Sequence, residues 1–357
     1  MLELSQPDFE KAFNLCRGVV KRRNTLPILG AVKIEKGKLS VTNLDIVVEA
    51  SFASKGKLSR TLAIEFGPLA RVIGSVPEGD AINLDAQKEG HDLAFNGASY
   101  QFLEYPVVDF PHDLIKIESD APTENVSNMG LIDVLSRVRF CISSEKTRYY
   151  LNGVSFMMYK GKAFAVATDG HRMALYPLDH IPCDGVGAIF PSRLVAYLVA
   201  RKQEPQTLSI LKTKACRFTW PGLEIRAKMI DGPFPDISRV IPEAKPVAEI
   251  DRLKLLTIVR RTSSINKKWS GGKFIFSANS VQLTGGLKGD GTTFRESLDC
   301  TVYVPDFEIN FNLKYVLEML SNMRGDMITV SCDGAMGASL WTSKTDRLQV
   351  LLMPMRG

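Results

Sequence analysis

The strongest constraint on the fold of this chain is a pattern that occurs three times along it. Each copy runs from a strand-like segment through a phenylalanine into an amphipathic helix, at residues 62–76, 187–200 and 307–320. The phenylalanines are Phe66, Phe190 and Phe311, so successive copies are 124 residues (66 to 190) and 121 residues (190 to 311) apart. One third of the 357 residues is 119, so the repeat fills the chain. A chain of this length also exceeds one ordinary core, which favours several domains.

Each third also opens with a second helical pattern. These segments lie at residues 5–20, 128–142 and 249–264. In the first of them, Ser5 and Asp8 have the spacing of a capping box, and Pro7 lies in the first turn, where its missing N–H costs little. In the copy at residues 62–76, the apolar residues of the helix recur at i, i+3, i+4 and i+7, the spacing of a stripe that packs on a core. They are Leu69, Val72, Ile73 and Val76.

Between the helices, the sequence alternates in short runs that end at Asn, Asp or Gly. Residues 38–50, 162–178 and 280–298 are examples, and β-branched and aromatic residues in such runs are typical of antiparallel hairpins. The sequence therefore predicts an α+β protein of three repeated domains, each with two helices packed on antiparallel sheets. We expect the domains at residues 1–120, 121–245 and 246–357.

Composition and motifs argue against several classes of protein. No apolar stretch is long enough to span a membrane, and the first residues lack a signal-peptide pattern, so we expect a cytoplasmic protein. Six scattered cysteines without paired spacing favour reduced thiols over a zinc site. The motifs for phosphate loops, dinucleotide binding, zinc proteases and serine hydrolases are absent, so we expect neither a cofactor nor a metal.

The stretch ATDGHRMALYPL, residues 167–178, contains the best candidate for catalysis. Asp169 could orient the imidazole of His171 as a general base, which would suit a small hydrolase. Asp-Gly is first of all a turn signal, however, and no nucleophile lies between the two side chains. We therefore favour a structural turn over catalysis and expect no enzyme.

Basic residues are frequent on the predicted helices, and the formal net charge is +6. Charges often do no more than solvate an outer helix face. Helices that all present cations would instead hold phosphates without reading bases. The residues we assign to DNA contact are Arg17, Arg23, Arg71, Arg137, Arg193, Arg201, Lys202 and Lys254.

Several unusual strings in this order resemble one family, the bacterial DNA polymerase III beta subunits, or sliding clamps. They are RRNTLPILGAVKI (22–34), RYYLNGV (148–154), ATDGHRMA (167–174), FPDISRVIP (234–242), FNLKYVLEML (311–320) and MPMRG (353–357). The resemblance covers the whole chain. It implies the DNA clamp fold and a ring of two identical subunits joined head to tail, whose helices surround duplex DNA. Weak, salt-sensitive contacts would let such a ring slide.

The resemblance also implies an apolar groove between the second and third domains that binds short peptides. It would be built from Leu151, Thr168, Gly170, His171, Arg172, Met173, Pro235, Arg239, Val240, Trp269, Tyr315, Met353, Pro354, Met355 and Arg356. The peptides would come from the polymerase III catalytic subunit, the clamp loader, other polymerases and repair proteins. Methionines suit such a site because they adapt to varied side chains. The chain ends in Gly357, where the family usually has leucine, so one apolar side chain is missing from the tail.

The implied subunit joint departs from the family pattern as well. Where similar clamps place two adjacent aliphatic residues, this chain has Ser263 and Ser264, followed by Ile265. Tyr100 and Phe102, on the expected edge strand of the first domain, would be their apolar partners. Loss of apolar anchors from an interface usually lowers affinity. A clamp-fold adaptor that binds peptides but does not encircle DNA is therefore the alternative to a DNA sliding clamp.

Overall fold

The computed structural model describes residues 1–21, 25–87, 90–111, 114–116, 121–211, 214–265, 271–286 and 293–355, and of Ile265 only the backbone. The chain divides into two compact units, the first made of residues 1–130 with 200–229 and the second of 131–199 with 230–357. Within the described ranges, no helix is both long and apolar enough to cross a membrane.

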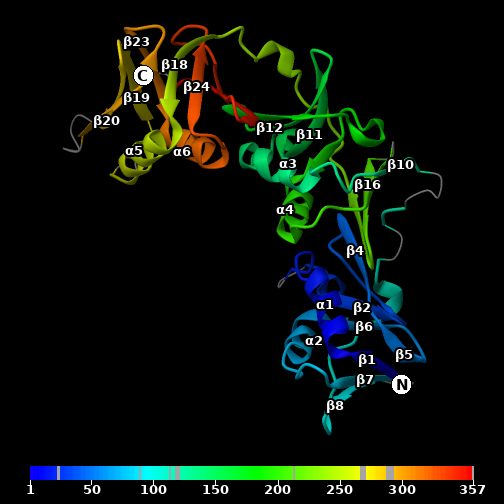
Figure 1. Ribbon diagram of the computed structural model, residues 1–357. Helices are drawn as coiled ribbons and strands as arrows, with labels where there is room; N and C mark the ends of the chain where they lie inside the picture. Colours follow the sequence, from blue (N-terminus) through cyan, green and yellow to red (C-terminus); the bar gives the residue numbers. More distant parts are fainter. Residues whose placement is uncertain are drawn as a thin grey trace. The chain divides into compact units, whose positions relative to one another are not determined.

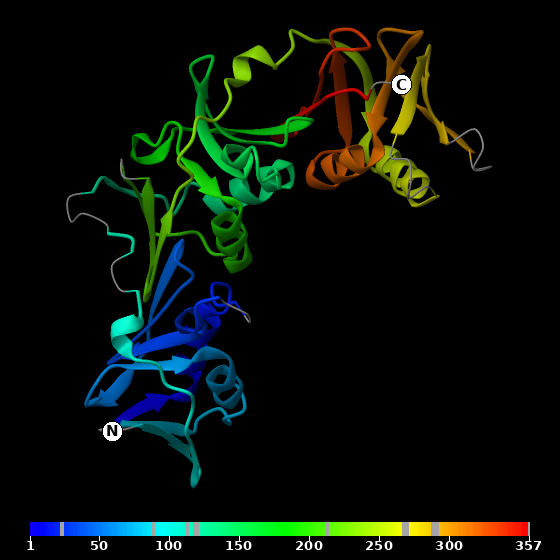
Figure 2. The ribbon, with the colours of Figure 1, turned by 180° about the vertical axis from the view of Figure 1, so that it is seen from behind.

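The first unit contains two antiparallel sheets. Its strands are β1 (Leu2–Ser5), β2 (Ala31–Glu35), β3 (Lys38–Thr42), β4 (Ile46–Ser51), β5 (Ser54–Gly56), β6 (Leu62–Glu65), β7 (Ala81–Ala86), β8 (His91–Phe95), β9 (Ala98–Tyr100), β10 (Thr123–Asn125), β15 (Thr207–Ile210), β16 (Ala215–Trp220) and β17 (Leu223–Lys228). One sheet has the order β5-β1-β7-β8-β9 and the other β10-β15-β16-β17-β4-β3-β2-β6. Helices α1 (Gln6–Cys16) and α2 (Phe66–Ile73) lie side by side against them (Figures 1 and 2). Short 3-10 turns lie at η1 (Pro27–Gly30) and η2 (Val107–Asp109).

The second unit also contains two antiparallel sheets. Its strands are β11 (Gly153–Tyr159), β12 (Lys162–Thr168), β13 (Arg172–Leu178), β14 (Ile189–Pro191), β18 (Lys245–Asp251), β19 (Gly271–Ser277), β20 (Ser280–Gly286), β21 (Thr293–Asp299), β22 (Thr301–Val302), β23 (Phe307–Asn312), β24 (Met327–Cys332), β25 (Ser339–Ser343) and β26 (Asp346–Leu352). The strand orders are β14-β11-β12-β13-β26-β25-β24-β18-β22 and β21-β20-β19-β23.

The helices of the second unit are α3 (Leu131–Val138), α4 (Ser192–Arg201, with its last two residues in the first unit), α5 (Arg252–Ile265) and α6 (Leu313–Asn322). Helices α5 and α6 pack side by side beneath the strands (Figures 1 and 2). Short 3-10 turns lie at η3 (Arg139–Cys141), η4 (Tyr149–Leu151), η5 (Pro182–Asp184) and η6 (Ile237–Arg239).

The predicted α+β fold is confirmed, and each repeated phenylalanine lies in a core. Phe66 stacks on Phe13 with 5.2 Å between ring centroids. Phe190 and Phe311 are at most 1% exposed and meet other phenylalanines edge to face, at 5.0 Å and 5.4 Å. All three lie in the core at a strand-to-helix junction, Phe66 as the first residue of α2 and Phe190 and Phe311 in the strands before α4 and α6, and their aromatic pairs add to the area buried.

One local prediction about the first helix is wrong. Ser5 is the N-cap residue of α1, but its side chain makes no capping hydrogen bond. Ser5 instead ends β1 and pairs with Ala81 of β7, so the helix begins directly from a strand. Pro7 lies in the first turn, as predicted.

The sheets run across the boundaries predicted between domains. Strand β17 pairs with β4, with Leu223 opposite Ala50, and β13 pairs with β26, with Arg172 opposite Leu352. The middle third of the chain thus supplies strands to both compact units. The division into three domains at residues 120 and 245 stays a prediction.

Candidate functional site

The turn between β12 and β13 is closed by its own side chains. The carboxylate of Asp169 accepts hydrogen bonds from the backbone N–H groups of His171 (2.9 Å) and Arg172 (3.0 Å). The hydroxyl of Thr168 accepts from the N–H of Gly170 at 3.1 Å and donates to the carbonyl of Arg172 at 2.7 Å. Gly170 has φ of 88°, a left-handed conformation that favours glycine. The local sequence T-D-G therefore specifies this turn.

The geometry of the turn does not support the hydrolase hypothesis. The second carboxylate oxygen of Asp169 accepts a hydrogen bond from Nε of Arg172 at 3.0 Å. The ring of His171 stacks on that of Tyr315, with 6.3 Å between centroids. Asp169 therefore holds the turn and a guanidinium group, and it does not orient an imidazole for proton transfer.

Arg172 connects this turn to helix α6. It is 9% exposed, and its Nη1 donates to the carboxylate of Glu318 at 2.6 Å. Its guanidinium also lies over the ring of Tyr315, 4.3 Å from the centroid. Burial and the nearby charge of Asp169 raise the pKa of the Tyr315 phenol, which keeps it neutral. A buried cation is thus paired with two carboxylates and an aromatic face.

Beside this turn lies a cavity of 180 Å³, which we call the groove. Its lining combines apolar side chains with a few polar groups, as binding pockets commonly do. The lining residues are Arg148, Tyr150, Leu151, Thr168, Gly170, Arg172, Met173, Pro235, Asp236, Val240, Leu351 and Met353. Eight of these were predicted: Leu151, Thr168, Gly170, Arg172, Met173, Pro235, Val240 and Met353.

The other predicted groove residues that the structure describes do not line this cavity. His171 and Tyr315 stack on each other next to Arg172. The side chain of Arg239 is 84% exposed and lies 3.6 Å from the carboxylate of Asp236. Pro354 and Met355 continue from β26, and the N–H of Met355 donates to the carbonyl of Asn310 at 2.8 Å. Trp269 and Arg356 lie outside the described residues.

Four lining residues were missed: Arg148, Tyr150, Asp236 and Leu351. Arg148 and Tyr150 belong to the string RYYLNGV, as does Leu151, so their closeness to Leu151 in the sequence could have indicated them. Arg148 lies so close over Gly170 that a Cβ there would be 2.6 Å from its Nη1. Leu351 lies two residues before Met353, a spacing that places side chains on one face of a strand.

The residues assigned to DNA contact differ in exposure. Arg17, Arg71, Arg193, Lys202 and Lys254 are exposed. In the first unit, Arg17 and Arg71 line one cavity of 850 Å³ together with Lys21. Arg201 is half-buried, with its guanidinium 5.1 Å from the ring centroid of Trp220. Arg23 lies outside the described residues.

The assignment of Arg137 to DNA contact is wrong. Its side chain is 5% exposed and is held by the carboxylate of Asp346 and the carbonyl of Asn322. A guanidinium fixed in this way cannot reach a phosphate. Arg139, two residues later, is exposed instead.

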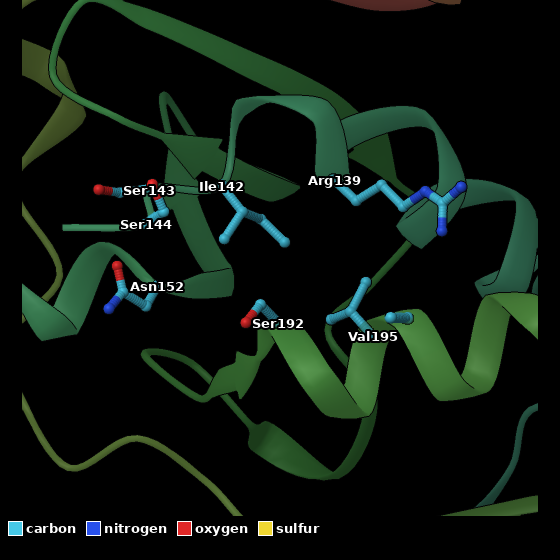
Figure 3. A pocket seen from close by; sticks show the side chains of 8 residues that line it. Arg139, Ile142, Ser143, Ser144, Asn152, Ser192 and Val195 are labelled. Atoms are coloured by element: carbon cyan, nitrogen blue, oxygen red, sulfur yellow. The ribbon is translucent and has the colours of Figure 1, made fainter. Parts of the chain in front are cut away.

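Arg139 borders a third cavity, of 460 Å³, between η3 and the first turns of α4 (Figure 3). Its lining residues are Arg139, Ile142, Ser143, Ser144, Asn152, Ser192, Val195 and Ala196. The polar groups among them are hydroxyls, one amide and one guanidinium, and none of the described residues that line this cavity carries a carboxylate. Such a lining suits an anion better than a cation.

The residues assigned to the subunit joint lie on an edge strand and a helix end. Strand β9 is at the edge of its sheet, and Tyr100 stacks on Phe95 (5.5 Å between centroids) and on Phe102 (6.5 Å). The hydroxyls of Ser263 and Ser264 donate to carbonyls of their own helix, at 2.6 Å and 2.7 Å. The side chain of Ile265 lies outside what the structure describes.

Comparison with known proteins identifies relatives over the whole chain. Two family profiles match, described as DNA polymerase III beta subunit, central domain (residues 125–236) and C-terminal domain (residues 238–356). The beta sliding clamps of Caulobacter vibrioides and Pseudomonas putida are 28% and 25% identical, each over 97% of both chains. A solved DNA polymerase III subunit beta from Bartonella birtlesii, bound to griselimycin, is 26% identical with a TM-score of 0.90, covering 100% of this chain and 99% of that one.

We predict that Asp169→Ala lowers the free energy of unfolding by about 2–4 kcal/mol, because two backbone N–H groups and the buried guanidinium of Arg172 lose their acceptor. Urea unfolding measures the change. The control is Asp179→Ala, which removes an exposed carboxylate paired with Arg347 and should change the stability by less than about 1 kcal/mol. Equal effects of the two substitutions would contradict the role given to Asp169.

Proposed function

The chain belongs to the family of DNA polymerase III beta subunits, the bacterial sliding clamps, and we propose that two copies close into a ring around duplex DNA and hold the replicative polymerase there. The observation that carries this proposal is the match of fold and sequence to sliding clamps over the full length of the chain. The similarity to beta sliding clamps supports the proposal that the protein is a processivity factor and not an enzyme. The protein would act in the bacterial cytoplasm, and its loader would use ATP.

Exposed cations on the helices would supply the DNA contacts. Arg17 and Arg71 in the first unit and Arg193 in the second support this, and Arg139 replaces Arg137 in the set. Long-range attraction to phosphates carries no base preference and weakens with salt. Such contacts let the ring slide along the DNA, while its closure prevents it from leaving the duplex.

The groove would hold short peptides of the partner proteins. Its wall of Leu151, Met173 and Met353 suits apolar side chains, and the guanidinium of Arg172 and the hydroxyl of Thr168 are polar groups that can fix a bound backbone. The relative from Bartonella birtlesii was solved with griselimycin, which supports ligand binding by a clamp of this fold. The partners would be the polymerase III catalytic subunit, the clamp loader, other polymerases and repair proteins.

The head-to-tail joint would pair the edge strand β9 with the region of Ser263 and Ser264. The stacked rings of Phe95, Tyr100 and Phe102 offer an apolar surface. Because both serine hydroxyls bond within their own helix, they require no polar partner from the second subunit. The joint is therefore compatible with an apolar contact of modest affinity.

We predict that labelled griselimycin binds this protein and that Val240→Glu weakens binding at least tenfold. Val240 lines the groove and is 43% exposed, so a carboxylate there is tolerated by the fold but is desolvated by an apolar ligand. Val186→Glu is the matched control, since Val186 is 61% exposed and lies outside the groove lining. Fluorescence anisotropy gives the affinities; equal binding by both variants would place the ligand elsewhere.

We also predict that replacing Arg17, Arg71 and Arg193 by Gln reduces the salt dependence of DNA binding. The magnitude of the slope of log K against log salt should fall by about 0.9 for each phosphate that the variant no longer neutralises. The control replaces three exposed lysines that lie outside the helices, in turns and loops between strands: Lys57, Lys160 and Lys344. A salt titration with open-ended duplex measures both slopes. An equal decrease in the control would contradict the assignment of these helix residues to DNA contact.

A further inference from the structure

A buried ion pair joins helix α3 to the last third of the chain. The guanidinium of Arg137 contacts the carboxylate of Asp346, at the start of β26, and the side chains are 7% and 4% exposed. Arg137 also donates to the backbone carbonyl of Asn322, the last residue of α6. Its Nε is buried and has no hydrogen-bond partner in the part of the chain that the structure describes. The carboxylate of Asp346 also accepts from the backbone N–H groups of Arg324 and Leu348, so the pair ties α3 to the backbone on both sides of it.

Helix α6 is therefore held at two places by arginines of the preceding third. Near its middle, Glu318 accepts from Arg172 at 2.6 Å. At its C-terminal end, the carbonyl of Asn322 accepts from Arg137, where a cation also suits the helix dipole. The two attachment points are one helical turn apart, and the side-chain amide of Asn322 donates to the carbonyl of Glu318 at 2.8 Å. A shift of the helix end would thus move Glu318 as well.

We propose that Arg137 and Asp346 are positioning residues for the groove, which they do not line. They fix the position of α6, and α6 fixes the guanidinium of Arg172 through Glu318 and the Tyr315 ring. Arg172 lines the groove, and its guanidinium is held by groups from the middle third and from the last third of the chain, Asp169 and Glu318. The inference rests on the proposed function, because it takes the groove as the ligand site.

A second ion pair made by helix α3 provides a control. Asp133, one turn before Arg137 on α3, pairs with Arg324 at 2.7 Å, and their side chains are 43% and 63% exposed. This pair joins α3 to the segment after α6 and is solvated, and exposed pairs contribute little. Removing it tests whether any loss of charge between α3 and the segment after α6 affects the groove.

The test measures labelled griselimycin binding and the thermal midpoint for Arg137→Lys, Asp346→Asn and Asp133→Asn. Arg137→Lys keeps the charge but loses the two-pronged contact with Asp346 and Asn322. We expect both buried-site variants to bind about tenfold more weakly and Asp133→Asn to bind like the parent protein. As a stability control, Ile34→Ala lowers the thermal midpoint through the core of the first unit and should leave affinity unchanged.

The double variant Arg137→Met with Asp346→Leu separates positioning from stability. Apolar residues in place of a buried ion pair can restore stability, but the leucine also leaves the backbone N–H groups of Arg324 and Leu348 without their acceptor. The hydrogen bond to the carbonyl of Asn322 is still absent in this variant, so we expect affinity to stay reduced even where the thermal midpoint rises above that of Asp346→Asn. Affinity that follows the midpoint across all variants would overturn the proposal.

Hydrogen exchange distinguishes failure of this inference from failure of the proposed function. The amides of His171 and Arg172 bond to Asp169, so movement of Arg172 should speed their exchange in Arg137→Lys but not in Asp133→Asn. If the parent protein does not bind griselimycin, faster exchange would still support the positioning role, and the groove would have another ligand. Unchanged exchange in Arg137→Lys would overturn the role itself.

Discussion

The guanidinium of Arg172 is the interaction on which the groove depends. It is buried between the carboxylates of Asp169 and Glu318 and the ring of Tyr315, so it joins the β12–β13 turn to helix α6. Neither element alone could satisfy this cation, since an unpaired buried charge is strongly destabilising. The groove therefore forms only where the middle third and the last third of the chain pack together. A change in that packing would change the residues that line the groove.

Continuous sheets explain how the repeats are joined. The register of β13 with β26 and of β17 with β4 carries backbone hydrogen bonds from one third into the next. Sheets extended in this way leave fewer unpaired edges. The edge at β9, with its stacked aromatic rings, is the one to which we assign the second subunit.

Much of the fold was predictable because helical periodicity and hairpin signals act locally. Eight residues that line the groove were predicted from strings that resemble the family. The turn among them was predictable because the residues T-D-G determine its local conformation. Arg137 and Arg139 show the limit: both are cations two residues apart on one segment, and only the structure distinguishes them. The difference comes from Asp346, which follows Arg137 by 209 residues in the sequence and is the buried partner of its guanidinium. Ser5 failed as a cap for a similar reason, because strand pairing with Ala81 decides its environment.

The central claim is that this protein encircles DNA. The most direct measurement loads it onto nicked circular plasmid, isolates the complex, and then linearises half of the sample at one site. A closed ring should remain on the circles and leave the linear molecules through their ends, at salt concentrations that screen the weak phosphate contacts. Equal retention on both forms would contradict encirclement and leave a peptide-binding adaptor as the better account.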